Sequence, residues 1–253
     1  MTTLTLNRND VHTGNLILVN AKYPIKSKSN IEIISADENH SNILMELGAR
    51  TVLSHILSDM NCTDEIVLVS GYRSNEEQKQ IYAKSLNESG RAFTEKYVAL
   101  PQCSEHQTGY AIDLGLKKDV IDFIRPNFPY DGICDKFRKI APKYGFIERY
   151  QSGKEAITGI AHEPWHFRFV GYPHSEIMTT KGLSLEEYIE DIKQYPYDGE
   201  HLKTIRGKGT IEIFYTPILS YKQIKLNMPE NCLYQVSGNN VDGFIITLWR
   251  QEK

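Results

Sequence analysis

Three short segments of the 253-residue chain carry the residue types that metal binding and acid–base chemistry require. They are SGYRS (residues 70–74), SEHQTGYAID (residues 104–113) and EPWH (residues 163–166). In the second segment, His106 and Asp113 are seven residues apart, an odd spacing that would send them to opposite faces of one continuous strand. Gly109 lets the chain bend between them, so we expect His106 on a loop and Asp113 on the strand that follows.

Asp113 lies within an apolar stretch, Ala-Ile-Asp-Leu, which predicts a buried carboxylate. A buried charge without a partner is strongly unfavourable. A metal ion would be such a partner, and so would a buried arginine or lysine. The residues around Asp113 leave both interpretations open.

The third segment contains a pattern that invites a different interpretation. His162-Glu163-Pro164-Trp165-His166 matches His-Glu-x-x-His, which in zinc proteases places two histidine ligands on one face of a helix. Pro164 would interrupt such a helix, because its ring clashes with the preceding turn and its nitrogen has no hydrogen to donate. The alternating Trp-His-Phe-Arg-Phe predicts a strand instead. We therefore expect His166 and Glu163 to act from a strand or its entry, and His162 not to be a ligand.

Together, the three segments favour a catalytic zinc site. His106, Asp113 and His166 offer two imidazoles and one carboxylate, which fill three positions of tetrahedral zinc and leave the fourth for water. Glu163 can take a proton from that water and return it to a leaving amine. Arg73 can offer its planar fork to a carbonyl oxygen that gains charge, or to a carboxylate. If each residue is considered without the other segments, the simpler interpretation of His166 is a packed core histidine, and that of Arg73 is a surface arginine.

The elements expected around these segments are short strands and helices without a regular alternation. A capping box, Ser74 with Glu77, follows the predicted strand 65–70 and opens a helix to about Ser89. The other predicted strands are residues 15–20, 30–35, 109–116, 146–150 and 165–170, and the other predicted helices are residues 41–60, 131–144 and 184–193. This mixture predicts an α+β fold, in which a central antiparallel sheet carries flanking helices.

The composition shifts near residues 195–208, which suggests a linker. We therefore expect a catalytic domain of residues 1–200 and a C-terminal extension of residues 201–253 that is rich in β-hairpins. Within this extension, the Ser-Gly-Asn-Asn stretch at residues 237–240 is typical of a hairpin loop.

Composition and charge narrow the class of protein. Apolar residues make up 40% of the chain and charged residues 24%, which excludes a wholly disordered protein. The formal net charge of −3 argues against nucleic-acid binding through phosphate contacts. We expect no signal peptide, no membrane anchor and a cytoplasmic location, because the start of the chain has no basic flank before a long apolar run, and the four scattered cysteines fit a reducing compartment.

The motifs SGYRS-x3-Q, SEHQTGYAIDLG and EPWHFR resemble those of the zinc D-alanyl-D-alanine peptidases related to VanY and VanX, and most of all the soluble bifunctional VanXY proteins. The resemblance covers roughly residues 15–195 and implies the zinc core that hedgehog-type domains share. It implies one zinc ion per chain, held by His106, Asp113 and His166. It also implies that Glu163 is the general base and acid, and that Arg73 stabilises the tetrahedral intermediate.

The same resemblance implies three further substrate contacts. Gln78 and Ser104 match positions that touch substrate, and Trp165 fits a wall of the pocket. For Gln78 and Ser104 the alternative is ordinary hydrogen bonding to the backbone, and for Trp165 it is a place in the core.

The activity that the resemblance implies is hydrolysis of the D-Ala-D-Ala dipeptide and removal of the C-terminal D-Ala of peptidoglycan precursors. In a cell that builds precursors with a different terminus, this activity removes the target of vancomycin. One alternative is a phage-type peptidoglycan endopeptidase whose residues 209–253 bind the cell wall. Another is a non-catalytic zinc-binding module, although such a module needs neither Glu163 nor Arg73.

Overall fold

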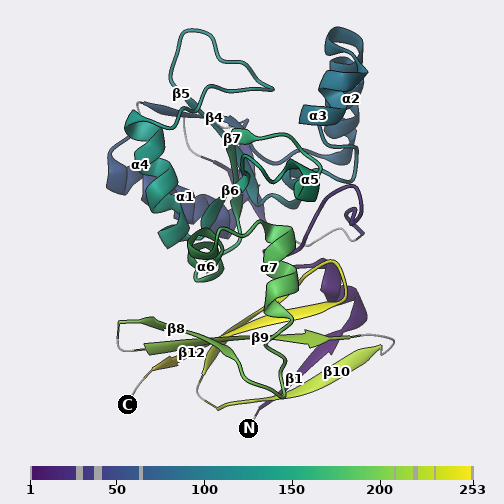
Figure 1. The fold of residues 1–253 in the computed structure, drawn as a ribbon, viewed down its shortest axis with the longest axis vertical. Helices are drawn as coiled ribbons and strands as arrows, with labels where there is room; N and C mark the ends of the chain where they lie inside the picture. Colours follow the sequence, from purple (N-terminus) through teal and green to yellow (C-terminus); the bar gives the residue numbers. More distant parts are fainter. Residues whose placement is uncertain are drawn as a thin grey trace. The chain divides into compact units, whose positions relative to one another are not determined.

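The structure is a computed structural model that describes residues 2–26, 31–36, 42–62, 65–207, 209–218, 222–230 and 232–251. The chain divides into two compact units. We call residues 19–25 and 29–184 the central unit, and residues 1–18, 26–28 and 185–253 the terminal unit. Each unit has its own sheets (Figure 1). Each also has its own cluster of buried apolar residues.

A four-stranded antiparallel sheet forms the centre of the central unit, with the strand order β4-β5-β7-β6. A short hairpin of two further strands precedes it in the chain. Among the described residues, the strands of this unit are β2 (Ile33–Ser35), β3 (Leu44–Glu46), β4 (Ile66–Ser70), β5 (Ala111–Leu116), β6 (Phe146–Tyr150) and β7 (Glu163–Phe169). The antiparallel sheet and the α+β class are therefore as the sequence predicts.

Helices flank this sheet, and two of them, α1 and α4, share an apolar core with it. Leu53 of α1 and Phe137 of α4 are buried together with Ile112 of β5 and Phe167 of β7. The helices of this unit are α1 (Leu47–Met60), α2 (Asn75–Ser89), α3 (Arg91–Tyr97), η2 (Glu105–Thr108), α4 (Gly132–Ile140), η3 (Ala141–Tyr144), α5 (Glu155–Thr158) and α6 (His174–Lys181). Because side chains alternate along a strand, the neighbours of Ile112 on β5 and of Phe167 on β7 face the other side of the sheet.

Helix α2 begins at the predicted capping box. The Ser74 hydroxyl accepts a hydrogen bond from the backbone nitrogen of Glu77, and the Glu77 carboxylate accepts one from the backbone nitrogen of Ser74. These two bonds satisfy donors that a helix start leaves open. They also fix the chain direction directly after Arg73, which places the first turn of α2 close to the end of β4.

The terminal unit is mainly β-structure. Its larger sheet has the antiparallel order β11-β12-β9-β8, and its smaller sheet pairs β1 with β10. The elements are β1 (Thr2–Asn7), η1 (Arg8–His12), α7 (Leu185–Ile192), β8 (Leu202–Arg206), β9 (Gly209–Pro217), β10 (Gln223–Met228), β11 (Leu233–Gly238) and β12 (Gly243–Gln251). The hairpin predicted at residues 237–240 is confirmed, and the Asn239 side chain accepts hydrogen bonds from the backbone nitrogens of residues 241–243.

Some predicted elements are wrong. Residues 15–20 form no strand, because this apolar segment makes separate hydrogen bonds instead of a ladder: the backbone nitrogen of Leu16 donates to the Ser237 hydroxyl, and that of Leu18 donates to the Asn239 carbonyl. The helix expected from residue 41 begins at Leu47, since residues 44–46 pair with β2. The expected linker at 195–208 contains strand β8. Residues 30 and 41 themselves lie outside the described residues.

The two compact units differ from the division expected at residue 200. Strand β1 belongs with β10 although the two lie at opposite ends of the chain, and residues 185–200 group with the terminal unit. Sequence patterns reveal local periodicity but not which distant strand is the partner. We predict that the central unit can fold independently.

A chain of residues 19–184 is expected to unfold cooperatively on heating, because it contains every strand and core helix of the central unit. A chain of residues 1–200, which ends at the boundary expected from sequence, keeps β1 without β10 and is expected to be less soluble. Circular dichroism and sedimentation would compare both with the full chain. An unfolded 19–184 chain would show that the central unit needs the terminal unit.

Candidate metal centre and active site

Two neighbouring strands and one short helix bring the three predicted ligands together. Asp113 of β5 lies directly opposite His166 of β7 in the antiparallel register. Both face away from the core residues Ile112 and Phe167, as strand alternation requires. His106 comes from η2, at the end of which Gly109 adopts a left-handed conformation with φ of 73° and turns the chain into β5. The predicted bend between His106 and Asp113 is therefore present.

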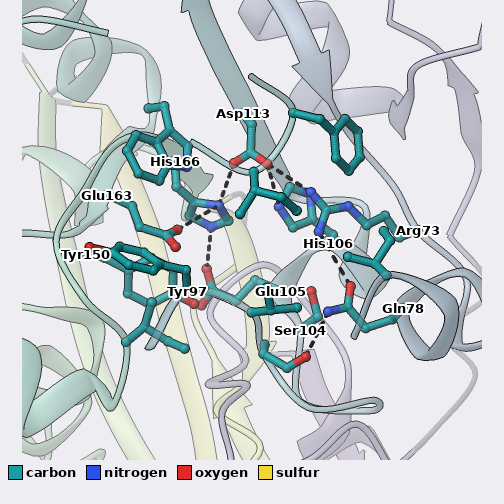
Figure 2. A pocket seen from close by; sticks show the side chains of 17 residues that line it. Arg73, Gln78, Tyr97, Ser104, Glu105, His106, Asp113, Tyr150, Glu163 and His166 are labelled. Atoms are coloured by element: carbon teal, nitrogen blue, oxygen red, sulfur yellow. Dashed lines mark hydrogen bonds and ion pairs between the residues drawn. The ribbon is translucent and has the colours of Figure 1, made fainter. Parts of the chain in front are cut away.

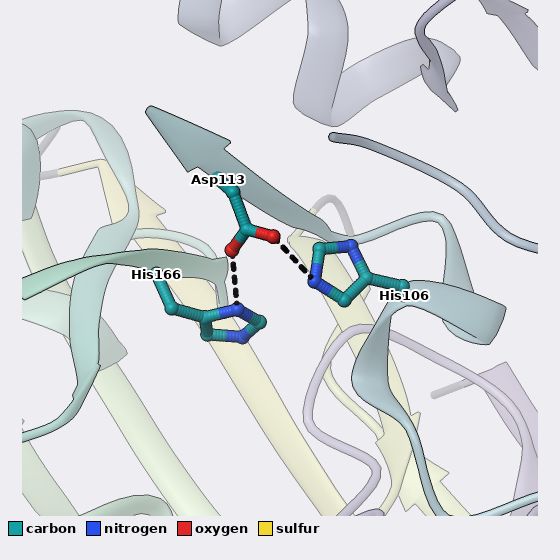
Figure 3. A group of neighbouring side chains, drawn as sticks. All are labelled: His106, Asp113 and His166. Atoms are coloured by element: carbon teal, nitrogen blue, oxygen red, sulfur yellow. Dashed lines mark hydrogen bonds and ion pairs between the residues drawn. The ribbon is translucent and has the colours of Figure 1, made fainter. Parts of the chain in front are cut away.

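The three side chains converge on one point (Figure 3). His106 Nε2 lies 3.1 Å from Asp113 Oδ2, and His166 Nδ1 lies 2.8 Å from Asp113 Oδ1. One potential ligand atom from each residue lies within 4.8 Å of the others, and all three residues are buried. This spacing is close enough for a single ion to contact all three.

The hydrogen bonds of the two imidazoles fit a metal site. His106 Nδ1 is 2.7 Å from the Gly71 carbonyl oxygen, which can only accept, so Nδ1 donates and Nε2 keeps its lone pair towards Asp113. His166 has Nδ1 towards Asp113 and Nε2 towards the Glu105 carboxylate at 3.5 Å. In metal sites one ring nitrogen binds the ion and the other is held by a protein acceptor. Two imidazoles and one carboxylate are a donor set that suits zinc with an open position.

Arg73 is a further partner of Asp113. Its Nη2 lies 3.0 Å from Asp113 Oδ2, its Nε donates to the Ser70 hydroxyl at 2.8 Å, and its Nη1 lies 3.5 Å from Gln78 Oε1. The side chain is only 13% exposed, so this is not a surface arginine. From the sequence, the partner of Asp113 could be a metal ion or a buried arginine or lysine. The structure supplies the arginine and, beside it, two imidazoles that an ion pair alone would not need.

Burial and neighbouring charges shift the pKa values of these groups. Burial, together with the charge of Arg73, lowers the pKa of His106 to about 4, which keeps this ring neutral at pH 7. Burial also opposes the charged form of His166, but hydrogen bonds to Asp113 and Glu105 outweigh it and raise the pKa of His166 to about 9. Burial would raise the pKa of Asp113, yet the two histidines hold it well below its usual range. The cluster therefore favours positive charge beside Asp113.

Glu163 lies at the start of β7 with its Oε2 4.0 Å from His166 Nδ1. Burial is the main cause that raises the pKa of Glu163 to about 8, the positive charge of His166 opposes this, and the negative charge of Asp113 adds to it. A carboxyl group that changes protonation state near neutral pH is suited to take up and release a proton.

The three predicted substrate contacts line the same pocket as these groups (Figure 2). Gln78 is buried in the first turn of α2, where its amide nitrogen donates to the Ala99 carbonyl at 2.8 Å and its oxygen faces Arg73. Ser104 is buried directly before η2. Trp165 lines the pocket and also belongs to the apolar core, and its contact with substrate stays a prediction.

Several residues of the site were missing from the sequence interpretation. Glu105, Tyr97, Phe123 and Tyr150 also line the pocket, and the ring of Tyr150 packs 4.9 Å from that of His166, centroid to centroid. Glu105 stands next to His106 in the SEH motif, and a charged residue directly before a predicted ligand was a usable signal. No local pattern indicates the aromatic residues.

His162 stands apart from the cluster. It precedes a strand, as predicted, and its Nε2 lies 2.6 Å from the Tyr130 hydroxyl and 3.5 Å from Glu148 Oε1. Its side chain is 30% exposed, unlike the buried His166. The helical His-Glu-x-x-His geometry is therefore absent from this segment.

No helix within the described ranges of the chain is long and apolar enough to cross a membrane.

Comparison with known proteins identifies the family to which this fold and this site belong. Residues 45–172 match the family model VanY, D-alanyl-D-alanine carboxypeptidase. This match covers more than half of the chain and includes every site residue predicted from the sequence. The chain belongs to this family.

Individual relatives extend the likeness beyond the site. The bifunctional D-Ala-D-Ala dipeptidase and D-Ala-D-Ala carboxypeptidase VanXYC of Enterococcus gallinarum is 39% identical over 181 residues, which cover 71% of this chain and 95% of that protein. A D-alanyl-D-alanine carboxypeptidase of Enterococcus faecium is 34% identical over 260 residues, 97% of this chain and 78% of the relative.

Solved structures give the same result. The vancomycin resistance D,D-dipeptidase VanXYg, in complex with a D-Ala-D-Ala phosphinate analogue, is 52% identical with a TM-score of 0.95, and the match covers 98% of this chain and 99% of that one. A VanY D,D-pentapeptidase in complex with Zn(II) is 28% identical with a TM-score of 0.57, over 69% of this chain and 98% of the other. The match to VanXYg includes the terminal unit as well as the central unit.

Replacing His162 by alanine is expected to leave zinc content near one ion per chain, because His162 bonds to Tyr130 and lies outside the ligand cluster. His166→Ala serves as the matched control and is expected to lose most of the metal. Elemental analysis after zinc loading and desalting would measure both. A clear drop in zinc for His162→Ala would restore the geometry that we reject.

Proposed function

We propose that this protein is a zinc metallopeptidase that hydrolyses the D-Ala-D-Ala dipeptide and removes the C-terminal D-Ala of peptidoglycan precursor peptides. The observation that carries the proposal is the convergence of His106, Asp113 and His166 in one pocket with Glu163 and Arg73. The names of VanXYC and VanXYg support the choice of substrate. Loss of terminal D-Ala removes the group that vancomycin binds, so the activity contributes to glycopeptide resistance.

The residues that would hold the zinc ion are His106, Asp113 and His166. Their donor set supports this assignment. So do the hydrogen bonds of the ring nitrogens that face away from Asp113, to the Gly71 carbonyl and the Glu105 carboxylate. Zinc, when bound there, supplies Lewis acidity that makes a water molecule reactive near neutral pH. The remaining chemistry falls to the side chains around it.

Glu163 is placed to move the proton. Its carboxylate lies beside His166 and lines the pocket, so it can accept a proton from the attacking water at Oε2. The same oxygen can then return the proton to the nitrogen of the departing D-Ala. Arg73 lies on the other side of Asp113 from Glu163 (Figure 2). Its guanidinium can donate to the carbonyl oxygen of the scissile bond as charge develops there.

Substrate binding in this proposal uses Gln78, Ser104 and Trp165. The Gln78 oxygen and the Ser104 hydroxyl offer polar contacts, and Trp165 offers an apolar wall for a methyl side chain such as that of D-Ala. The cytoplasmic location expected from the sequence also stays a prediction, which fractionation of cells that express the protein would test.

The substrate prediction is tested with zinc-loaded protein and three substrates: free D-Ala-D-Ala, a soluble precursor pentapeptide and intact cell walls. We expect release of D-Ala from both soluble substrates and no lysis of walls. Wall lysis without release of D-Ala would instead indicate an endopeptidase. A protein that holds one zinc ion and turns over none of the three would indicate a binding module.

Glu163→Gln is expected to retain zinc and to lower kcat for D-Ala release about 10²- to 10⁴-fold, because the amide cannot carry the proton. Glu155→Gln, an exposed position on α5, is the control and should leave kcat unchanged. Zinc analysis and D-Ala release would be measured on the same preparations. Loss of zinc from Glu163→Gln would make Glu163 a ligand and contradict its role as a proton carrier.

A further inference from the structure

We propose that Glu105 is a positioning residue that fixes the His166 imidazole for metal binding, and that two buried arginines hold Glu105 for this task. The inference rests on the proposed zinc site and extends it to residues outside the ligand set. The residues concerned are Glu105, Arg149 and Arg168.

The two carboxylate oxygens of Glu105 have different partners (Figure 2 shows the second). Oε1 lies 2.8 Å from Arg149 Nε and 3.1 Å from Arg168 Nη1. Oε2 lies 3.5 Å from His166 Nε2. One oxygen is therefore fixed by the arginines, and the other is directed at the ring.

These side chains come from three separate elements. Glu105 is the first residue of η2 and directly precedes His106, while Arg149 lies on β6 and Arg168 on β7. Arg168 is two residues after His166, so strand alternation places both on the same face of β7. The cluster thus ties the segment that carries one histidine to the strand that carries the other.

The burial of this cluster is hard to explain by stability alone. The side chains of Glu105, Arg149 and Arg168 are all 0% exposed. Burying ionised groups carries a large desolvation penalty, and apolar side chains of similar volume often stabilise a core equally well or better. Charged groups at such a place therefore point to a task that apolar residues cannot perform.

That task is orientation of the ring. An ionised carboxylate at Nε2 keeps a proton on that nitrogen, which leaves Nδ1 as the atom that faces Asp113 at 2.8 Å. His106 is held in the same way but by a neutral acceptor, the Gly71 carbonyl. A carboxylate also raises the basicity of the imidazole more than a carbonyl does, which strengthens its bond to a metal.

The test compares zinc dissociation constants, measured by competition with a chelator, for the wild type and Glu105→Gln. Loss of such a partner typically weakens metal binding 10- to 100-fold, and we expect a loss in this range. Glu148→Gln is the matched control, because Glu148 is also a poorly exposed carboxylate bonded to an arginine, Arg138, but its other side-chain partners are Tyr130 and His162 rather than His166. It is expected to change thermal stability without changing zinc affinity.

A second variant separates orientation from charge balance. Glu105→Gln combined with Arg168→Met removes one negative and one positive charge, so the net charge of the buried cluster stays that of the wild type. We expect it to melt nearer to the wild type than Glu105→Gln while its zinc affinity stays low. Wild-type zinc affinity in either folded variant would overturn the proposal and leave Glu105 a purely structural role.

A measurement on the unmodified protein decides the matter even if both variants fail to fold. Nitrogen-15 NMR of zinc-loaded protein reports which imidazole nitrogen of His166 carries the proton. We expect the proton on Nε2, and a proton on Nδ1 would refute the inference. None of these measurements uses turnover, so zinc binding without D-Ala release would contradict the proposed function and leave the role of Glu105 to be judged separately.

Discussion

The structure of the site depends on one buried carboxylate that must be surrounded by positive charge. Asp113 is 4% exposed and lies within an apolar strand, where an unpaired charge would be strongly unfavourable. Its contacts are Arg73 after β4, His106 on η2 and His166 on β7. Because each comes from a different segment, satisfying this single group fixes the relative positions of all three.

The same region holds a second buried carboxyl group, Glu163, whose pKa is shifted in the opposite direction to that of Asp113. Glu163 and Asp113 are equally inaccessible, yet burial raises the pKa of Glu163 to about 8, whereas close contacts with both histidines keep the pKa of Asp113 low. The difference lies in distance: Asp113 lies 2.8 Å from His166 Nδ1, and Glu163 lies 4.0 Å from it. Environment alone thus makes one carboxylate suited to hold a cation and the other to exchange a proton.

Much of this arrangement could be predicted from the sequence because its signals are local. The alternation of Trp-His-Phe-Arg-Phe revealed a strand, Pro164 excluded a helix, and Gly109 marked the bend. Long-range contacts have no such signal. Arg149 gives no hint in FIERY that it reaches Glu105, and residues 15–20 have the composition of a strand but bond to the β11–β12 hairpin instead. The pairing of β1 with β10 was missed for the same reason.

The site residues are positioned in two ways, by paired strands and by a short helix. Two proposed ligands, Asp113 and His166, and the proposed proton carrier, Glu163, lie on β5 and β7, which are joined in register, so their relative positions vary little as long as the sheet holds. The third proposed ligand, His106, lies on a helix of four residues, which has little stability of its own. Two neighbouring residues of this helix hold it in place. His106 Nδ1 donates to the Gly71 carbonyl, and the Glu105 carboxylate pairs with Arg149 and Arg168. Hydrogen bonds and ion pairs thus position His106, whereas strand pairing positions Asp113 and His166.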